Sequence, residues 1–303
     1  MKLKTKSYYL KQTLLHILLI AGSLLFVVPL FIVISSSFSS ADAIEKFGYS
    51  IFPKEWVFDA YKEIFRNPTS LIDAYKVTTI ISVITTVLGV FLMSMAAYPL
   101  SRKNFVLKKF STLYIFLPML FSGGLIPSYI INTQFLNLGN SYLIYILPSL
   151  INVWNIIVIR TFFQGLPGEM IESAKIDGAS EFSILFKFII PLSKPVIATI
   201  SLLMLLSKWN DWNTTLIYIR DNKLYTLQYL LQRILKEAEF LKNTAQNAAS
   251  LNLGNISVDQ MKNVSTEAMR YAMCVIAAGP MLVIFPFFQK YFAKGLTIGS
   301  VKG

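Results

Sequence analysis

Apolar segments long enough to cross a membrane, separated by polar ones, dominate the chain. A helix needs about 20 mostly apolar residues to cross the roughly 30 Å hydrocarbon core of a bilayer. The segments that meet this requirement are 14–34, 77–99, 111–131, 142–162, 189–209 and 271–289. Each should be helical, because lipid offers no partner to an unpaired backbone group. The pattern predicts an all-α membrane protein with six transmembrane helices.

Composition supports this fold class. Hydrophobic residues make up 54% of the 303 residues, and the mean hydropathy of +0.56 is a value that soluble domains rarely reach. The formal net charge of +12 would suggest nucleic-acid binding in a soluble protein. Here the basic residues flank the spans, as they do where positive charge marks the cytoplasmic side. We therefore expect membrane lipid as a partner, and not nucleic acid.

The basic residues also set the expected orientation. The N-terminal MKLKTKSYYLKQ and the linker SRKNFVLKKF carry Lys or Arg and no acidic residue, so both should be cytoplasmic. The chain then divides into a cytoplasmic N-terminus 1–13, a six-span domain 14–291 and a cytoplasmic tail 292–303, with an outer loop at 210–270. A cleaved signal peptide is the alternative for the first span, but its apolar run exceeds the roughly 7–15 residues of a signal core.

Several kinds of chemistry lack the residues they need. The single His16 and single Cys274 argue against a His-based metal site, a disulfide within the chain and a Ser/His/Asp or Cys/His catalytic set. The phosphate-binding pattern GxxxxGK[ST] does not occur. No expected span contains Asp or Glu, which counts against an ion-coupled carrier. The sequence thus predicts no catalytic residue, no metal and no cofactor in this chain.

A charged stretch between the fourth and fifth spans, at 165–188, has the pattern of two short helices. Good helix formers fill EMIESAKI, with acidic residues in its early turns. Gly178 is a predicted left-handed helix end, and Ser180 can cap the next helix. An apolar helical face is then predicted from Phe182, Leu185, Phe186, Ile189 and Ile190. Periodicity alone leaves open whether this is an ordinary surface loop or a contact for another protein.

The spacing within this stretch resembles the cytoplasmic motif E-A-A-x3-G-x9-I-x-L-P of ABC importer permeases. Its Glu, second Ala, Gly and Pro have counterparts here at the same spacing, whereas Ser173, Phe188 and Ile190 depart conservatively. The resemblance implies that the stretch forms coupling helices that dock into a cleft of an ATPase subunit. The residues implied for this contact are Glu172, Ser173, Ala174, Asp177, Gly178, Ala179 and Pro191.

The C-terminal QKYFAKGLTIGSVKG is similar to the tail GLT-x-G-x-VKG of the smaller permease in maltose-type sugar importers. In that family the tail reaches the ATPase dimer interface. The resemblance implies this role for Gly295, Thr297, Gly299, Val301 and Lys302. FSGGLIPSYI and LPSLINVWN further resemble the branch that serves polysaccharide fragments.

This family resemblance implies a non-enzymatic permease of six spans with a cytoplasmic coupling-helix loop, in the bacterial cell membrane. It would translocate a carbohydrate, an oligosaccharide, by ATP-driven alternating access. The implied partners are a second permease subunit, two ATPase subunits that bind ATP and Mg, and an extracellular solute-binding protein. The alternatives from other classes are a secondary transporter of a small solute and a membrane scaffold or receptor that moves nothing.

Polar residues within the spans are candidates for the substrate path. Asn152 and Asn155 share a predicted helical face with Pro148, and Trp154 lies beside them, so amides and a ring could meet sugar hydroxyls and C–H groups. Helix packing through the amides is the alternative. Gly123 and Gly124 interrupt the third span and could line a cavity. The small face of Thr78, Ser82, Thr85 and Gly89 is predicted to pack against a neighbouring helix, and Trp209 and Trp212 to anchor at the membrane interface.

Overall fold

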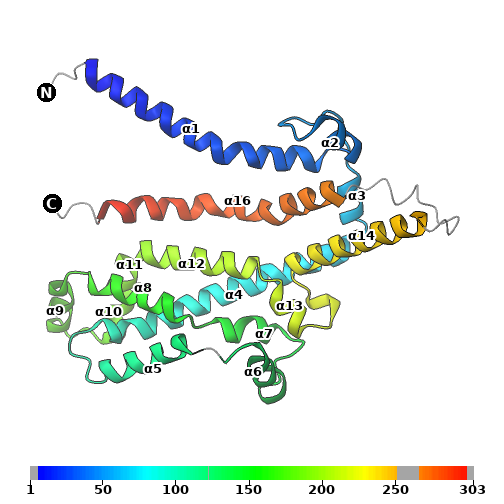
Figure 1. Ribbon diagram of the computed structural model, residues 1–303. Helices are drawn as coiled ribbons and strands as arrows, with labels where there is room; N and C mark the ends of the chain where they lie inside the picture. Colours follow the sequence, from blue (N-terminus) through cyan, green and yellow to red (C-terminus); the bar gives the residue numbers. More distant parts are fainter. Residues whose placement is uncertain (1–5, 122, 251–265, 299–303) are drawn as a thin grey trace. The chain divides into compact units, whose positions relative to one another are not determined.

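The computed structural model describes residues 6–121, 123–250 and 266–298, and every regular element within these ranges is helical. The chain forms two units, Met1–Pro68 with Leu231–Gly279 and Thr69–Leu230 with Pro280–Gly303. Figure 1 labels the helices along the chain. The all-α prediction is confirmed for the part of the chain that the structure describes.

Three helices can cross a membrane as unbroken elements. They are α1 (Lys6–Ser37), α4 (Pro68–Ser101) and α16 (Thr266–Ile298). Each remaining predicted span is a pair of helices bent at a short break, so the described residues hold up to six spans. The number of apolar segments is confirmed, and three of them depart from the continuous helices that the sequence predicted.

The bent pairs break where backbone hydrogen bonding is interrupted. The third predicted span is α5 (Lys108–Leu120) followed by α6 (Leu125–Ile130) and the π-helical η1 (Ile131–Phe135). The fourth is α7 (Tyr142–Ile146) with η2 (Leu147–Ser149), bent by 46° against α8 (Val153–Gln164). The fifth predicted span, 189–209, is α11 (Ile190–Leu192) and α12 (Lys194–Trp209). The bent pair begins earlier, because α10 (Glu181–Ile184) and η3 (Leu185–Ile189) from the predicted loop continue into α11, and the pair is bent by 80° before α12. Pro148 and Pro195 lie at two of these breaks, because proline has no N–H to continue a helix.

In the first unit, the segment after α1 is folded. Helices α2 (Ala41–Phe47) and α3 (Asp59–Ile64) follow α1, and Ser40 caps α2 by accepting from the Ala43 N–H at 3.1 Å. The Phe38 ring lies 4.9 Å from the Tyr61 ring between centroids, and the Ser37 and Tyr61 hydroxyls are 2.9 Å apart. These contacts tie the end of α1 to α3.

The predicted outer loop at 210–270 is largely helical where it is described. It contains α13 (Asn213–Tyr218), η4 (Asn222–Leu224) and α14 (Leu227–Ser250), and α16 already begins at Thr266. Arg270 forms an ion pair with Glu239, and the Tyr49 hydroxyl donates to Glu267 at 3.3 Å. The sequence underestimated these helices because their polar faces lack the continuous apolar character of a span.

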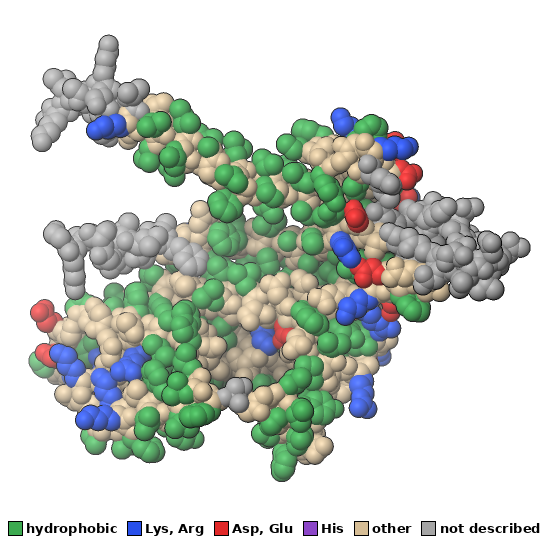
Figure 2. Space-filling model, viewed as in Figure 1, with side chains coloured by type: hydrophobic (Ala, Val, Ile, Leu, Met, Phe, Trp, Pro, Cys, Tyr) green, Lys and Arg blue, Asp and Glu red, His purple; other side chains and the backbone are tan. Residues whose placement is uncertain are grey.

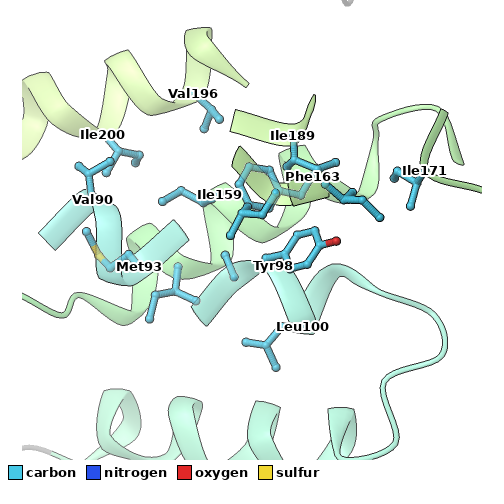
Figure 3. Packing of buried hydrophobic residues seen from close by; sticks show 14 of the residues in the cluster. Val90, Met93, Tyr98, Leu100, Ile159, Phe163, Ile171, Ile189, Val196 and Ile200 are labelled. Atoms are coloured by element: carbon cyan, nitrogen blue, oxygen red, sulfur yellow. The ribbon is translucent and has the colours of Figure 1, made fainter. Parts of the chain in front are cut away.

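The second unit is built on α4, α8 and α12, which share one apolar cluster (Figure 3). Val90 and Met93 of α4 meet Ile159 of α8 and Ile200 of α12 in this cluster. A Cβ on Gly89 would come within 2.5 Å of the Met204 Cε of α12 and 3.0 Å of the Leu150 carbonyl, so the Met204 side chain and the backbone before α8 fill the space against Gly89. Thr78, Ser82 and Thr85 are buried as well, which confirms the predicted packing face of α4.

Side-chain types are unevenly distributed over the surface (Figure 2). Apolar side chains cover the span helices, and on α1 Leu25 and Phe26 are 76% and 80% exposed. In the second unit, charged side chains gather at the end that carries α9 (Gly168–Ile176) and α10. An apolar surface of this kind requires lipid or another apolar partner.

Candidate functional site

The turn between α9 and α10 has the geometry that its sequence predicts. Gly178 adopts φ +77°, which is the left-handed conformation expected at a helix end. The Ala179 N–H donates to the Ala174 carbonyl at 2.9 Å and the Gly178 N–H to the Lys175 carbonyl at 3.0 Å, so these two carbonyls near the end of α9 are satisfied. Both bonds belong to the Schellman motif.

The start of α10 is as predicted, and its predicted apolar face is partly buried. The Ser180 Oγ accepts from the Ser183 N–H at 3.3 Å, so the predicted cap is confirmed. Leu185 and Ile189 of the predicted face are buried and Ile190 packs against the same cluster, whereas Phe182 is 65% exposed and Phe186 39% exposed. Ile184, which the prediction left out, is buried as well, and Leu185–Ile189 form the π-helical η3.

The residues implied for ATPase contact are mostly open to a partner. Glu172, Ser173, Asp177, Gly178 and Pro191 are exposed. Ala174 is buried in the apolar cluster, and Ala179 is half-buried against it. Ile176 is a large apolar side chain that is 86% exposed at the tip of α9. The loop is thus anchored by one side and presents charged and apolar groups on the other.

A polar network that sequence reasoning missed joins this loop to the end of α4. The Glu181 carboxylate accepts from the Tyr98 hydroxyl at 2.5 Å and forms an ion pair with the Lys175 Nζ at 2.6 Å. Arg102 donates to the Tyr98 hydroxyl at 2.7 Å. Beside the network lies a cavity of about 400 Å³, partly lined by Pro99 and these four residues. The spacing of Tyr98 and Arg102, four residues apart at the end of a helix, was the available signal.

A second pocket, of about 470 Å³, lies between α4, α8 and α12. Its lining includes Asn152, Trp154 and Asn155, three of the predicted path residues, together with Thr85. Asn155 is buried and Trp154 is 51% exposed. Thr85 Oγ1 is buried without a hydrogen-bond partner among the described residues. The pocket therefore offers polar groups and one aromatic face to a ligand.

The sequence predicted Asn152 on one continuous helical face with Pro148 and Asn155, and the structure differs. Asn152 is the N-cap of α8, and its Oδ1 accepts from the Asn155 N–H at 3.1 Å. Its own N–H approaches the Met93 sulfur at 3.4 Å. Because the helix breaks before α8, Pro148 is not on the same helix as Asn155. Asn152 and Asn155 nevertheless line the same pocket.

An ion pair at the edge of this pocket was also missed. Lys208 lines the pocket, and its Nζ lies 2.8 Å from Asp211 Oδ2, with both side chains nearly buried. Asp211 also accepts from the Thr214 N–H and hydroxyl. The neighbouring Trp209 is 4% exposed, so the predicted interface anchor is wrong for that residue. The sequence KWNDWN shows both charged residues, but it does not predict that their side chains are nearly buried.

The other predicted site residues lie elsewhere. Gly123 and Gly124 are exposed between α5 and α6 and do not line the pocket; Gly124 has φ +85°. Gly295 and Thr297 belong to the end of α16, whereas Gly299, Val301 and Lys302 lie outside the described residues. No group of three or more His, Cys, Asp or Glu residues within the described ranges could hold a metal ion. The roles implied for the tail and for the two glycines stay predictions.

Comparison with known protein families gives one match that covers most of the chain. Residues 86–298 match the family described as the binding-protein-dependent transport system inner membrane component. The match includes the second half of α4, the loop site, every pocket-lining residue except Thr85, and α16 as far as Ile298.

Individual relatives align along almost the whole length. The chain is 38% identical over 279 residues to Protein LplC of Bacillus subtilis, covering 91% of this chain and 90% of that protein. It is 34% identical over 290 residues to the polygalacturonan/rhamnogalacturonan transport system permease protein YtcP of the same organism, covering 96% and 97%. A solved chain of a bacterial ABC transporter involved in the import of the acidic polysaccharide alginate has a TM-score of 0.72 and 26% identity, covering 96% of this chain and all of that one.

Proposed function

Since the chain belongs to the family of binding-protein-dependent transport system inner membrane components, we propose that it is the permease subunit through which an ABC importer moves an oligosaccharide. The observation that carries this proposal is the pair of sites in the second unit. One is an exposed loop suited to a soluble partner, and the other is a polar pocket among the span helices. A permease needs both, because its energy arrives outside the membrane and its substrate crosses within it.

The loop formed by α9, the Gly178 turn and α10 is the contact for the ATPase subunits. Glu172 and Asp177 present charge, and Ile176 presents an apolar side chain that a cleft could bury. Burial of such a side chain contributes about 1.5–3 kcal/mol. The tail at 295–303 reaches the same ATPase subunits, and these subunits bind ATP and Mg.

The pocket lined by Asn152, Trp154 and Asn155 is part of the path. Amides donate to and accept from hydroxyls, and an aromatic face packs against the C–H groups of a sugar ring. Because relatives with named substrates carry saccharide chains, the substrate class is an oligosaccharide. A second permease subunit completes the path, and an extracellular binding protein delivers the sugar.

Both ends of the chain lie in the cytoplasm under this proposal, and the loop at 165–188 faces the same side. The basic segments at the N-terminus and at 101–110 support this orientation. ATP binding would open the path outward, and hydrolysis would return it inward.

Uptake in vesicles that contain the permease pair, the ATPase subunits and the binding protein tests the function. In vesicles whose lumen faces the cytoplasmic side of the permease, we expect labelled oligosaccharide to accumulate only when the lumen contains ATP. A proton or sodium ionophore should leave accumulation unchanged. Uptake that needs no ATP and collapses with the ionophore would contradict the proposal in favour of a secondary carrier.

A further inference from the structure

Glu181 occupies a junction between three helices of the second unit. It is the first residue of α10, and its two carboxylate oxygens bind different elements. Oε2 accepts from the Tyr98 hydroxyl of α4 at 2.5 Å, and Oε1 lies 2.6 Å from the Lys175 Nζ of α9. A single side chain therefore connects both helices of the coupling loop to the span.

Tyr98 is held in position from the other side. Tyr98 is 7% exposed and packs in the apolar cluster that Figure 3 shows. Arg102 donates to the same hydroxyl at 2.7 Å, and its guanidinium carbon lies 4.4 Å from the ring centroid. With the ring buried and the hydroxyl shared, Tyr98 has little freedom to reorient.

The network matters for geometry more than for stability. The Lys175 and Glu181 side chains are 51% and 54% exposed, and such pairs contribute only about 0–1 kcal/mol. A cavity of about 400 Å³ lies beside them, lined from α4 by Tyr98 and from α10 by Glu181. At its edge the hydrogen bond between Tyr98 and Glu181 adds a directional polar link to the apolar contacts of Tyr98 with Ile184 and Leu185 in the cluster.

Helix α4 continues from this link to the pocket. Tyr98 and Thr85 lie on the same uninterrupted helix, and Thr85 lines the pocket of about 470 Å³. Thirteen residues at 1.5 Å rise separate them by roughly 20 Å. A displacement of α10 that pulls on Tyr98 is carried to Thr85 by one rigid element.

We propose that Glu181 and Tyr98 are positioning residues that transmit movement of the coupling loop to α4 and so to the substrate pocket. This inference rests on the proposed function, since it needs an ATPase to move the loop. The hydroxyl of Tyr98 and the carboxylate of Glu181 act as one link, so removing either should have the same consequence as removing both.

The test measures sugar transported per ATP hydrolysed by the assembled complex in vesicles. We expect Tyr98→Phe, Glu181→Ala and the double variant each to lower this ratio several-fold and to a similar extent. ATPase co-purification should be retained in all three. Glu181→Gln keeps an acceptor oxygen for Tyr98 and should retain more coupling than Glu181→Ala. If Glu181→Ala does not assemble, Tyr98→Phe keeps the test decisive, because it removes the same hydrogen bond from the other side. Tyr114→Phe, which removes a hydroxyl from an exposed tyrosine of α5, is the matched control and should leave the ratio unchanged.

A merely structural role would lower assembly or thermal stability and leave the ratio intact in the complexes that form. Wild-type ratios in Tyr98→Phe and Glu181→Ala would overturn the inference, as would effects that add in the double variant. Failure of the wild-type complex to show ATP-driven uptake would instead overturn the proposed function. The two failures are therefore separate results.

Discussion

Single residues define both candidate sites, and Gly178 shows most directly how. It has φ +77°, and no atom lies within 4 Å of the place where a Cβ would be. Any cost of a side chain there comes from the backbone conformation and not from a clash. Gly168, at the start of α9, has equally open surroundings but is not in the left-handed region.

This pair of glycines gives a matched prediction. Gly178→Ala should destabilise the turn by about 1–2 kcal/mol, the cost of a left-handed conformation for a residue with a Cβ. Membrane insertion should be normal, and less ATPase should co-purify. Gly168→Ala should leave ATPase retention unchanged. Equal retention by the two variants would contradict the role of the turn.

The pocket residues differ in what their loss should do. Asn155→Ala and Trp154→Ala should raise the sugar concentration for half-maximal uptake at constant expression, because they remove polar and aromatic contacts from the pocket. Asn152→Ala should in addition lose an N-cap worth roughly 1 kcal/mol, whereas Asn152→Ser keeps a capping oxygen. Uptake as a function of sugar concentration is the measurement.

Thr161→Ala is the control for these substitutions. Thr161 lies on α8, is exposed, and donates to the Ile157 carbonyl within its own helix. Its replacement should not change uptake. If the three pocket variants also match the wild type, the sugar passes elsewhere.

At the scale of elements, the bent helix pairs and the unbroken helix α4 contribute differently to the two sites. The break between η2 and α8 places Asn152 at a cap, and the π-helical η3 follows α10 directly. The unbroken α4 contributes Tyr98 and Thr85 to the two sites. The bent spans therefore supply most residues of the pocket, and the continuous helix runs between the sites.

The end of α16 yields a prediction at this scale. Deletion of residues 295–303 should leave insertion intact, because it removes only the last residues beyond the apolar span that ends at Tyr291. If the tail reaches the ATPase subunits, sugar-stimulated ATP hydrolysis by the purified complex should fall. Deletion of residues 1–5 is the control and should preserve stimulation. Full stimulation after both deletions would remove the tail from the coupling machinery.

At the scale of the whole molecule, orientation in the membrane is the property to test. The chain has one cysteine, Cys274, so a Cys274→Ser background allows single reporters. Val106 is 94% exposed after α4, and Phe52 is 78% exposed between α2 and α3. Both positions are open enough to react wherever reagent reaches them.

Intact cells treated with a membrane-impermeant maleimide should label Phe52→Cys and not Val106→Cys. Val106→Cys should react only after permeabilisation, because the basic segment around it is predicted to be cytoplasmic. The reverse pattern would invert the topology and place the coupling loop on the wrong side for an ATPase.

The sequence by itself determined the apolar segments, the α9 turn and the candidates for both sites. Span length follows from bilayer thickness, and the Gly178 end and Ser180 cap follow from local backbone chemistry, so each could be predicted from neighbouring residues. Asn152, Trp154 and Asn155 were found for the same reason, since polar groups are conspicuous in an apolar segment.

Only the tertiary structure decided what depends on distant residues or on a local irregularity. Tyr98 and Glu181 are 83 residues apart, and no local pattern predicts their hydrogen bond. Lys208 and Asp211 are three residues apart, but only the folded chain shows that their ion pair is nearly buried and that Lys208 lines the pocket. The predicted apolar face that begins at Phe182 was only partly right: Leu185 and Ile189 are buried, whereas Phe182 is 65% exposed. Helix periodicity is a local property, whereas the link between the coupling loop and the pocket depends on how α4 packs against the helices around it.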